Sequence, residues 1–409
     1  MSKRRVLSLF SGCGGMDLGF EGDFPCLYKS VNLNIHPDWV VSRDGEWVQL
    51  SPTMFETVFA NDIRPDAKVA WTKYFQKRKQ DAADIYHLES IVDLVKKSNN
   101  KCFRFPKKID IVTGGFPCQD FSVAGKRLGF ESQKSHLGVL LEKDEPSEES
   151  RGKLYIWMRD VVSIVKPKLF IAENVKGLTN LRDVKEIMEH DFSAACDGGY
   201  LVVPARVLYA ADYGVPQSRE RVIFFGFKKN CLKKKALREL LKEEISAAYD
   251  PYPQKTHGKG LQDYVTCEDA FSGLDEPEIS KDKAQKMFSK GKFLGHGQGQ
   301  SEVKLNSVGP TIRSEHHGNI EYRRLSLEHG GTHHEELKAG LTERRLTVRE
   351  CARIQTFPDD YEFVFDKSEN EPGLCSSDAY KIIGNAVPCV LAYSIAKNIE
   401  SKWDKYFKK

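Results

Sequence analysis

Short apolar runs, separated by segments with helical spacing, dominate the first part of the chain. The runs predict buried strands at residues 6–10, 58–61, 109–113, 169–173, 206–209 and 222–227. Apolar residues from Ile156 to Val165 form one helical face, and Pro167 ends that helix. Nearly continuous apolar strands that alternate with helices predict an α/β fold with a doubly wound, mostly parallel sheet. Such sheets bind their ligands at the carboxyl ends of the strands.

The pattern changes after residue 228. A basic stretch leads into residues 250–335, which are irregular and rich in Gly, Pro, Ser, His and Lys. The 409 residues also exceed the usual limit of roughly 250–300 for one hydrophobic core. We therefore predict a first domain at residues 1–228, a second, smaller and irregular domain at 229–340, and a return segment at 341–409 that completes the first domain.

Two helices are predicted in the return segment. A capping box from Thr347 to Glu350 opens a helix that ends at Pro358. The last helix begins near Pro388, and its apolar stripe needs a partner, which we expect to be the sheet of the first domain.

Composition excludes several classes of protein. The ten cysteines form no C-x-x-C pair, which argues against a zinc module and a small disulfide scaffold and favours reduced thiols. The apolar run at residues 6–10 is shorter than the roughly 7–15 residues of a signal peptide core, and no run of about 20 apolar residues predicts a membrane span. We expect a cytoplasmic protein without a metal. The net charge of +4 permits nucleic-acid binding without arguing for it.

The most informative residue is Cys118, which follows Pro117 on a loop shaped by Gly114 and Gly115. A thiol on a loop at the carboxyl end of a strand is where an α/β enzyme places a nucleophile. Free cysteines are also among the most often buried residues. By itself, the motif therefore leaves a structural role open.

A glycine-rich turn follows the first strand. Glycines let the backbone turn sharply and approach a ligand closely, and Gly12 and Gly14 stand in such a turn. The dinucleotide fingerprint is not met because Asp17 occupies its last glycine position. Asp62, at the end of the second predicted strand, suits the two hydroxyls of a ribose. A purely structural turn remains the alternative.

Six motifs, taken in order, resemble those of the cytosine-5 DNA methyltransferases. They are Ser-Gly-x-Gly-Gly at 11–15, Gly-Phe-Pro-Cys-Gln at 115–119, Glu-Asn-Val at 173–175, Gln-x-Arg-x-Arg at 217–221, Arg-Glu-Cys-Ala-Arg at 349–353 and Gly-Asn-x-Val-Pro at 384–388. The resemblance covers most of residues 1–228 and 341–409. It implies a methyltransferase fold whose second domain, residues 229–340, recognises the DNA target.

The resemblance also implies a mechanism. Cys118 would add to carbon 6 of cytosine and make carbon 5 nucleophilic, dividing one hard step into two easier ones. Arg219 and Arg221 would hold the nucleophile loop and the ring oxygen. Glu173 would engage ring nitrogen 3 and the exocyclic amine, and Pro117 would offer its carbonyl to that amine. No side chain is identified as the base that removes the carbon-5 proton, and a water molecule is an alternative.

S-adenosylmethionine is the methyl donor that the resemblance implies. Its expected partners are Phe10, Gly12 and Gly14 around the cofactor, Asp62 on the ribose, Asp84 on the adenine amine, Asn385 near the methionine moiety and Leu154 packed nearby.

The implied macromolecular partner is double-stranded DNA, from which the target base must be flipped out. Ser122, Lys126 and Arg127 would close over the base and touch phosphates. Arg313, in Thr311-Ile312-Arg313, is a candidate for bidentate contact with guanine, and a phosphate-binding or solvated arginine is the alternative. Residues 316–319 are expected to contact DNA; metal binding there is the weaker interpretation.

Two insertions have no predicted function: the acidic residues 131–150, and residues 23–54, which contain Trp39 and Trp47 and are expected to form a hairpin. Two other functions compete: a tRNA methyltransferase of the same fold, and a DNA-binding regulator on an inactive scaffold. Intact Cys118, Glu173, Arg219 and Arg221 argue against the regulator. We expect a monomeric prokaryotic modification enzyme with a cognate restriction endonuclease.

Overall fold

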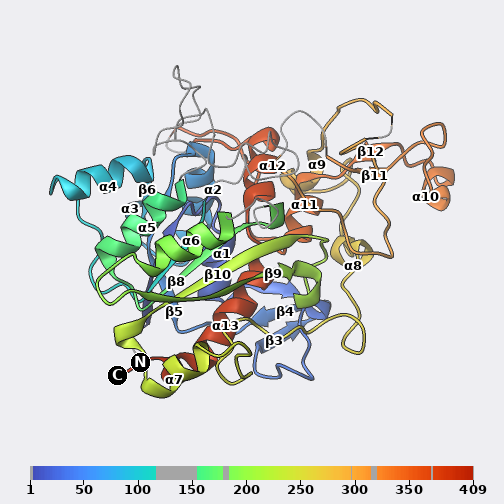
Figure 1. Cartoon of the computed structure of the whole chain (residues 1–409). Helices are drawn as coiled ribbons and strands as arrows, with labels where there is room; N and C mark the ends of the chain where they lie inside the picture. The colour runs from blue at the N-terminus through green and yellow to red at the C-terminus, as the bar shows by residue number, and fades with distance from the viewer. Residues whose placement is uncertain are drawn as a thin grey trace.

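The protein is described by a computed structural model that covers residues 3–116, 154–177, 184–295, 297–314, 320–369 and 372–408. Its central sheet has seven strands in the order β6-β5-β1-β7-β8-β10-β9 (Figure 1). Their bounds are β1 Arg4–Leu9, β5 Phe55–Asp62, β6 Tyr86–Leu88, β7 Ile111–Gly115, β8 Leu169–Val175, β9 Tyr200–Tyr209 and β10 Glu220–Lys228. Neighbouring strands are parallel except at β10, which runs antiparallel to β8 and β9. The predicted doubly wound, mostly parallel sheet is confirmed.

Helices cover both faces of the sheet because its central strands are apolar on both sides. In β1, Val6 belongs to the core on one face, while Leu7 and Leu9 belong to the core on the other. The first core contains α1 (Gly15–Glu21), α2 (Pro65–Phe75) and α13 (Cys389–Tyr406). The second contains α4 (Ile91–Asn99), α5 (Leu154–Val165) and α6 (Val184–Ser193).

All six predicted strands are present, and the strand of the central sheet that was not predicted is β6. It has three residues at the edge of the sheet, too few for an apolar period to be visible. The expected hairpin in residues 23–54 is confirmed as β3 (Val40–Asp44) and β4 (Trp47–Leu50), and β2 (Pro25–Leu27) extends it to three antiparallel strands.

The return segment folds as expected. Helix α11 (Val348–Ile354) begins with the predicted capping box between Thr347 and Glu350 but ends before Pro358. Helix α13 begins after Pro388 and packs on α1. The two helices approach closely at Gly19, where a Cβ would overlap the Ala392 side chain.

The remaining elements are short. They are η1 Tyr28–Ser30, α3 Ala82–Ile85, η5 Ala210–Tyr213, η6 Lys229–Cys231, α7 Lys234–Leu240, α8 Cys267–Phe271, α9 Lys283–Lys286, β11 Tyr322–Arg324, α10 His334–Lys338, β12 Arg344–Arg345 and α12 Ser376–Asn385. Elements α8 to β12 lie to one side of the sheet, in yellow and orange in Figure 1.

The stretch from 229 to 257 stays with the sheet. Leu232 forms a β-bridge with Phe407 after α13. The Tyr252 hydroxyl donates to the Ile223 carbonyl at 2.8 Å and lies beneath β10. The irregular part of the chain that projects from the sheet therefore begins near residue 258.

Residues Ser376–Tyr406 are long and apolar enough to cross a membrane by length and composition alone. However, 83% of their most apolar window is buried inside the protein. This is the burial of a core helix, and it agrees with the packing of α13 on α1 and the sheet.

Candidate active site

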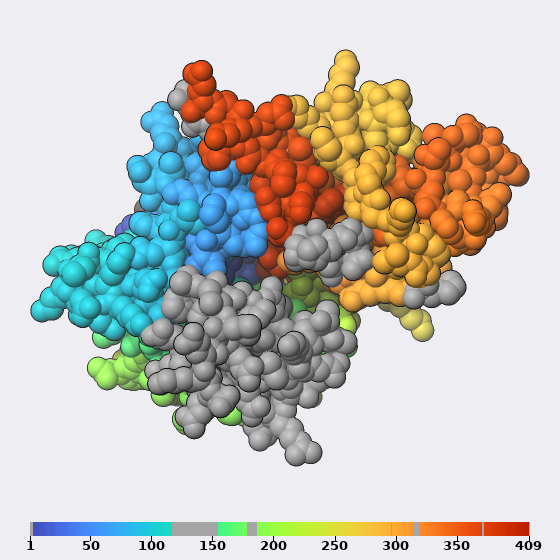
Figure 2. All heavy atoms as spheres, turned by 90° about the horizontal axis from the view of Figure 1, so that it is seen from above, coloured from blue at the N-terminus to red at the C-terminus, as the bar shows by residue number. Residues whose placement is uncertain are grey.

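A cavity opens at the carboxyl ends of β1, β5, β7 and β8, the edge where the fold predicts a ligand. It brings together eight residues predicted from the sequence: Phe10, Gly12, Asp62, Leu154, Glu173, Arg219, Arg221 and Asn385. Seen from above in Figure 2, the C-terminal segment in red lies between the early strands and helices in blue and the irregular region in yellow and orange. The cavity therefore lies where segments distant in sequence meet.

A buried ion pair forms one wall of this cavity. Glu173, 8% exposed, lies near the end of β8, and its Oε1 lies 2.7 Å from Nε of Arg221 on β10. Gly115 pairs with Glu173 across β7 and β8, and a Cβ on Gly115 would lie 2.9 Å from Oε2. Glycine is therefore needed at the end of β7 to leave room for the carboxylate. The paired groups present a fixed hydrogen-bonding edge beside Phe116.

Arg219 joins three parts of the chain. Its side chain is 1% exposed and lines the cavity. Nη1 donates to the Ile312 carbonyl and Nη2 to the Gly384 carbonyl, both at 2.9 Å. Gln217 makes a parallel link, because its Oε1 accepts from the Ile312 backbone N–H at 3.0 Å. The predicted Gln-x-Arg-x-Arg motif thus ties the start of β10 to the irregular region and to the end of α12.

The opposite end of the cavity is shaped for a ligand with hydroxyl groups. The Asp62 carboxylate accepts from the backbone N–H groups of Gly12 and Arg64, each at 3.0 Å. Burial raises the pKa of Asp62, and these two hydrogen bonds oppose that rise. The turn that brings Gly12 to Asp62 places Phe10 at φ 53°, a left-handed conformation that is rare for a residue with a side chain.

Two predicted cofactor residues lie elsewhere. Gly14 precedes α1 at φ 79°, where a Cβ would lie 2.5 Å from the Trp71 side chain, so it serves packing behind the turn. Asp84 is exposed on α3 and does not line the cavity. The loop after β6 instead places Ser90 and Ile91 in the wall.

Sequence reasoning missed Ser90 because β6 was not recognised. Its side chain caps α4 by accepting from the Val92 N–H. The signal was present, since Ser90-Ile91-Val92-Asp93 has the spacing of a helix cap before an apolar run. Arg64 and Ser314 also line the cavity without having been predicted.

Arg313 is held by an ion pair. Its Nη1 lies 2.9 Å from Oε1 of Glu321. Burial raises the pKa of Glu321, and Arg313 opposes that rise. Next to it, the Thr311 hydroxyl donates to the Ser218 carbonyl at 2.6 Å. The Thr-Ile-Arg element therefore packs directly against the Gln-x-Arg-x-Arg motif.

Several predictions fall outside the described residues: Pro117, Cys118, Ser122, Lys126, Arg127, the insertion at 131–150 and His316 to Asn319. Within the described ranges, no group of three or more His, Cys, Asp or Glu side chains is arranged to hold a metal ion.

The family is decided by comparison with known proteins. The family model of the C-5 cytosine-specific DNA methylases matches residues 4–401. The chain belongs to this family. The methylase is 32% identical to the Type II methyltransferase M.BspRI of Lysinibacillus sphaericus, over 99% of this chain and 84% of that enzyme. It is 28% identical to M.NgoPII of Neisseria gonorrhoeae, over 98% and 96% of the two chains.

Solved structures agree on the fold of the methylase. The Dnmt2 methyltransferase of S. pombe superposes with a TM-score of 0.56 at 20% identity, covering 97% of this chain and 99% of that one. Entamoeba histolytica EhMeth gives a TM-score of 0.56 at 14% identity, covering 99% of both chains. The resemblance inferred from the six motifs is confirmed, and the methylase transfers a methyl group to carbon 5 of cytosine in DNA.

Proposed function

We propose that this methylase transfers the methyl group of S-adenosylmethionine to one cytosine within a specific double-stranded DNA sequence, as the modification enzyme of a Type II restriction–modification system. The observation that carries the proposal is the buried Glu173–Arg221 pair, which lines the same cavity as the Asp62 cradle. The Type II methyltransferases similar to this chain support the biological setting.

The described residues suit S-adenosylmethionine. Asp62 has two backbone donors that fix its carboxylate, and its remaining lone pairs can accept the two ribose hydroxyls. Phe10, Ile91 and Leu154 supply apolar surface, and Asn385 lies exposed at the end of α12. When bound, the cofactor supplies an activated methyl group.

The proposed reaction is divided between the residues of this chain. The Cys118 thiolate bonds to carbon 6 of the flipped cytosine, and the electron pair of the 5,6 double bond becomes available at carbon 5. Glu173 hydrogen-bonds ring nitrogen 3 and the exocyclic amine, and Arg221 holds the carboxylate in place. After methylation, loss of the carbon-5 proton to a base restores the double bond and expels Cys118.

Target recognition is assigned to residues 258–345 rather than to all of 229–340. Residues 229–257 pack on β9, β10 and α13, as Leu232 and Tyr252 illustrate. The Thr311-Ile312-Arg313 element contacts the catalytic arginine motif, so the recognition region can couple base contacts to the cavity.

Replacement of the nucleophile tests the proposal. Cys118→Ser is expected to abolish transfer of labelled methyl groups to duplex DNA and to leave S-adenosylmethionine binding unchanged. A serine hydroxyl is far less ionised than a thiol, whose pKa is about 8.5. Cys102→Ser, which alters an exposed thiol beside α4, is the matched control and should remain active.

Full activity of Cys118→Ser would contradict the mechanism. The same assay with tRNA beside duplex DNA tests the substrate class, and methylation of tRNA alone would overturn the DNA proposal. Bisulfite sequencing of DNA from cells that express the methylase would identify the modified cytosine.

A further inference from the structure

The N-terminal insertion, residues 23–54, is attached firmly to the catalytic body. Trp39 packs edge-on against Tyr393 of α13 with ring centroids 5.2 Å apart. The Tyr393 hydroxyl lies 2.8 Å from the Ser51 hydroxyl and donates to the Ser51 carbonyl at 3.0 Å. His36 stacks on Trp39 at 3.8 Å. One end of the insertion is therefore anchored on the core helix of the catalytic domain.

The other end of the insertion meets the entrance of the recognition region. The Lys29 carbonyl accepts from His257 Nε2 at 2.9 Å and from Gln262 Nε2 at 2.6 Å. The Lys29 ammonium lies 2.5 Å from the Asp269 carboxylate, and Asn32 donates to the Thr256 carbonyl at 2.8 Å. These contacts join η1 to the chain that leads into α8.

The contact region around Lys29 and His257 also touches η5, which precedes Arg219 in the chain. The Asp212 carbonyl in η5 accepts from the backbone N–H groups of Thr256 and His257, at 2.8 and 3.1 Å. A Cβ on Gly214 would overlap the Ser30 carbonyl and lie 2.8 Å from the His257 ring. The insertion, the residues directly before the recognition region and η5 thus meet at van der Waals distance, a few residues before Arg219.

His257 contacts both the insertion and the chain around η5. It is 1% exposed, and burial lowers its pKa. A neutral ring can donate from Nε2 to Lys29 and accept at Nδ1 from the Thr256 hydroxyl, 2.8 Å away. Nε2 therefore links His257 to the insertion, and the bond from the neighbouring Thr256 fixes the orientation of the ring.

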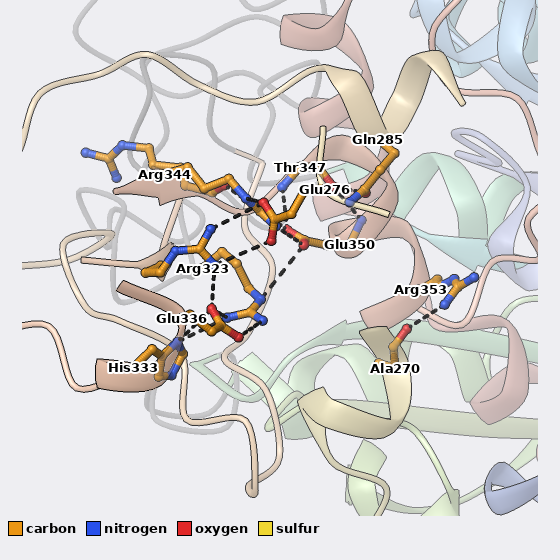
Figure 3. Close-up of polar contacts among 12 residues, drawn as sticks. Ala270, Glu276, Gln285, Arg323, His333, Glu336, Arg344, Thr347, Glu350 and Arg353 are labelled. Atoms are coloured by element: carbon orange, nitrogen blue, oxygen red, sulfur yellow. Dashed lines mark hydrogen bonds and ion pairs between the residues drawn. The ribbon is translucent and has the colours of Figure 1, made fainter. Parts of the chain in front are cut away.

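Arg353 of α11 makes a second connection between the insertion and the recognition region. Its guanidinium lies 5.0 Å from the ring centre of Trp47 in the insertion. It also donates to the carbonyl of Ala270 in α8 at 3.1 Å (Figure 3). A second bond, to the carbonyl of Ser272 directly after α8, is 2.7 Å long. The insertion therefore contacts the residue that holds the carboxyl end of α8.

Between these contacts, a groove remains at the boundary between the insertion and the recognition region. A groove lined by Leu27 and Glu46 of the insertion and by Glu268, Phe271 and Leu305 of the recognition region separates the two parts. Side chains do not fill this part of the boundary. The polar contacts of Lys29 and His257 therefore help to set the orientation of the recognition region here.

We propose that the N-terminal insertion is a brace that fixes the recognition region, residues 258–345, against the catalytic arginine segment, with Lys29 and His257 as positioning residues. This proposal rests on the proposed role of residues 258–345 in DNA recognition. The brace limits the orientations in which the recognition region meets DNA. It thereby improves both affinity for the target and discrimination against near-target sequences.

The first test removes one contact of the brace. Lys29→Met keeps the length of the side chain and loses the ion pair with Asp269. We expect the KM for target DNA to rise about two- to fivefold, the range that a partly exposed ion pair supports. The preference for the target over single-mismatch duplexes should fall by a similar factor, while kcat and the affinity for S-adenosylmethionine stay unchanged.

Lys242→Met is the matched control. Its ammonium lies 2.6 Å from Glu239, and the exposed side-chain fractions of that pair, 54% and 16%, nearly equal the 56% and 16% of Lys29 and Asp269. The Lys242 pair lies in the α7 region and does not touch the insertion. The control therefore accounts for loss of one positive charge and one comparable ion pair.

A second pair of variants tests His257. His257→Ala should produce a larger loss of discrimination than Lys29→Met. His257→Gln should restore most of it, because its amide can donate to the Lys29 carbonyl. If His257→Ala does not fold, the test compares the mismatch discrimination of His257→Gln with that of Lys29→Met and Lys242→Met.

Equal DNA KM values and equal mismatch ratios for Lys29→Met and Lys242→Met would overturn the brace. This outcome is distinguishable from failure of the proposed function, in which the unmodified methylase itself would not transfer methyl groups to duplex DNA.

Discussion

At the residue scale, one side chain in this methylase both lines the cavity and joins distant segments of the chain. A buried guanidinium has five N–H donors to satisfy, and Arg219 directs two of its groups to the main-chain carbonyls of Ile312 and Gly384. The sequence motif predicted a catalytic role for Arg219, and the side chain does line the cavity. Its contacts with two distant segments could not be predicted, because nothing near position 219 specifies which carbonyls will surround it.

Asp17 is a second residue whose environment determines its chemistry. It is 1% exposed behind the glycine turn and accepts from Trp71 Nε1 at 2.7 Å. Burial raises its pKa from 3.8 to about 6. The folded protein therefore holds a proton on Asp17 between about pH 4 and 6 that the unfolded chain releases.

Asp17→Asn tests this pH dependence. Because the folded pKa of Asp17 is raised, the wild type loses stability as pH rises from 4 to above 6, by an amount on the order of 3 kcal/mol. Asparagine does not titrate and can still accept from Trp71. Urea unfolding should show the variant gaining stability over the wild type at pH 7.5, with little difference at pH 4. An equal difference at both pH values would contradict the assignment.

At the scale of elements, the Arg-Glu-Cys-Ala-Arg motif has a structural role in helix α11. Glu350 completes the cap at Thr347, and its two oxygens each accept from Arg344 at 2.9 Å. Arg344 also donates to Glu276 at 2.9 Å, as Figure 3 shows. The motif identifies the family in the sequence, and in the fold it joins α11 to the recognition region.

Glu350→Ala should therefore be strongly destabilising. It removes the helix cap and leaves the buried Arg344 with one carboxylate partner fewer, and removing one partner of a buried ion pair costs about 3–5 kcal/mol. Chemical unfolding measures the change. Glu335→Ala is the control, because this exposed glutamate pairs only with Lys338 in the described contacts, and its loss should change stability by less than about 0.5 kcal/mol. Similar losses in both variants would contradict the assigned role.

At the scale of the whole molecule, the cavity is assembled from segments more than 370 positions apart, from Phe10 to Asn385. The predicted strands located its edge correctly, because ligands of such sheets bind at the carboxyl ends of the strands. Asp84, which the sequence predicted to contact the adenine amine, does not line the cavity. Strand β6 and the loop behind it were not visible as a periodic pattern. The cavity wall there is Ser90 and Ile91.

A ligand that binds the assembled cavity should stabilise the whole fold. At one hundred times its Kd, S-adenosylmethionine is expected to add about 2.7 kcal/mol to the free energy of unfolding by mass action. Asp62→Asn should weaken binding about 10- to 100-fold, because hydrogen bonds to a charged group contribute about 1.5–3 kcal/mol. Thermal unfolding with and without the cofactor measures both effects. An unchanged cofactor response in Asp62→Asn would contradict the ribose assignment.

The sequence alone determined the family, the fold class, six strands of the sheet, the capping box of α11, the start of α13 and eight of the residues that line the cavity. These depend on local apolar periods and on motifs only a few residues long. The tertiary structure alone decided which strands are neighbours and where the recognition region leaves the catalytic body. It also decided how the N-terminal insertion contacts the recognition region. Those features depend on contacts such as Lys29 with Asp269 and Arg219 with Gly384. Only the folded chain brings these residues together, because their neighbours in sequence contain no information about partners so far away.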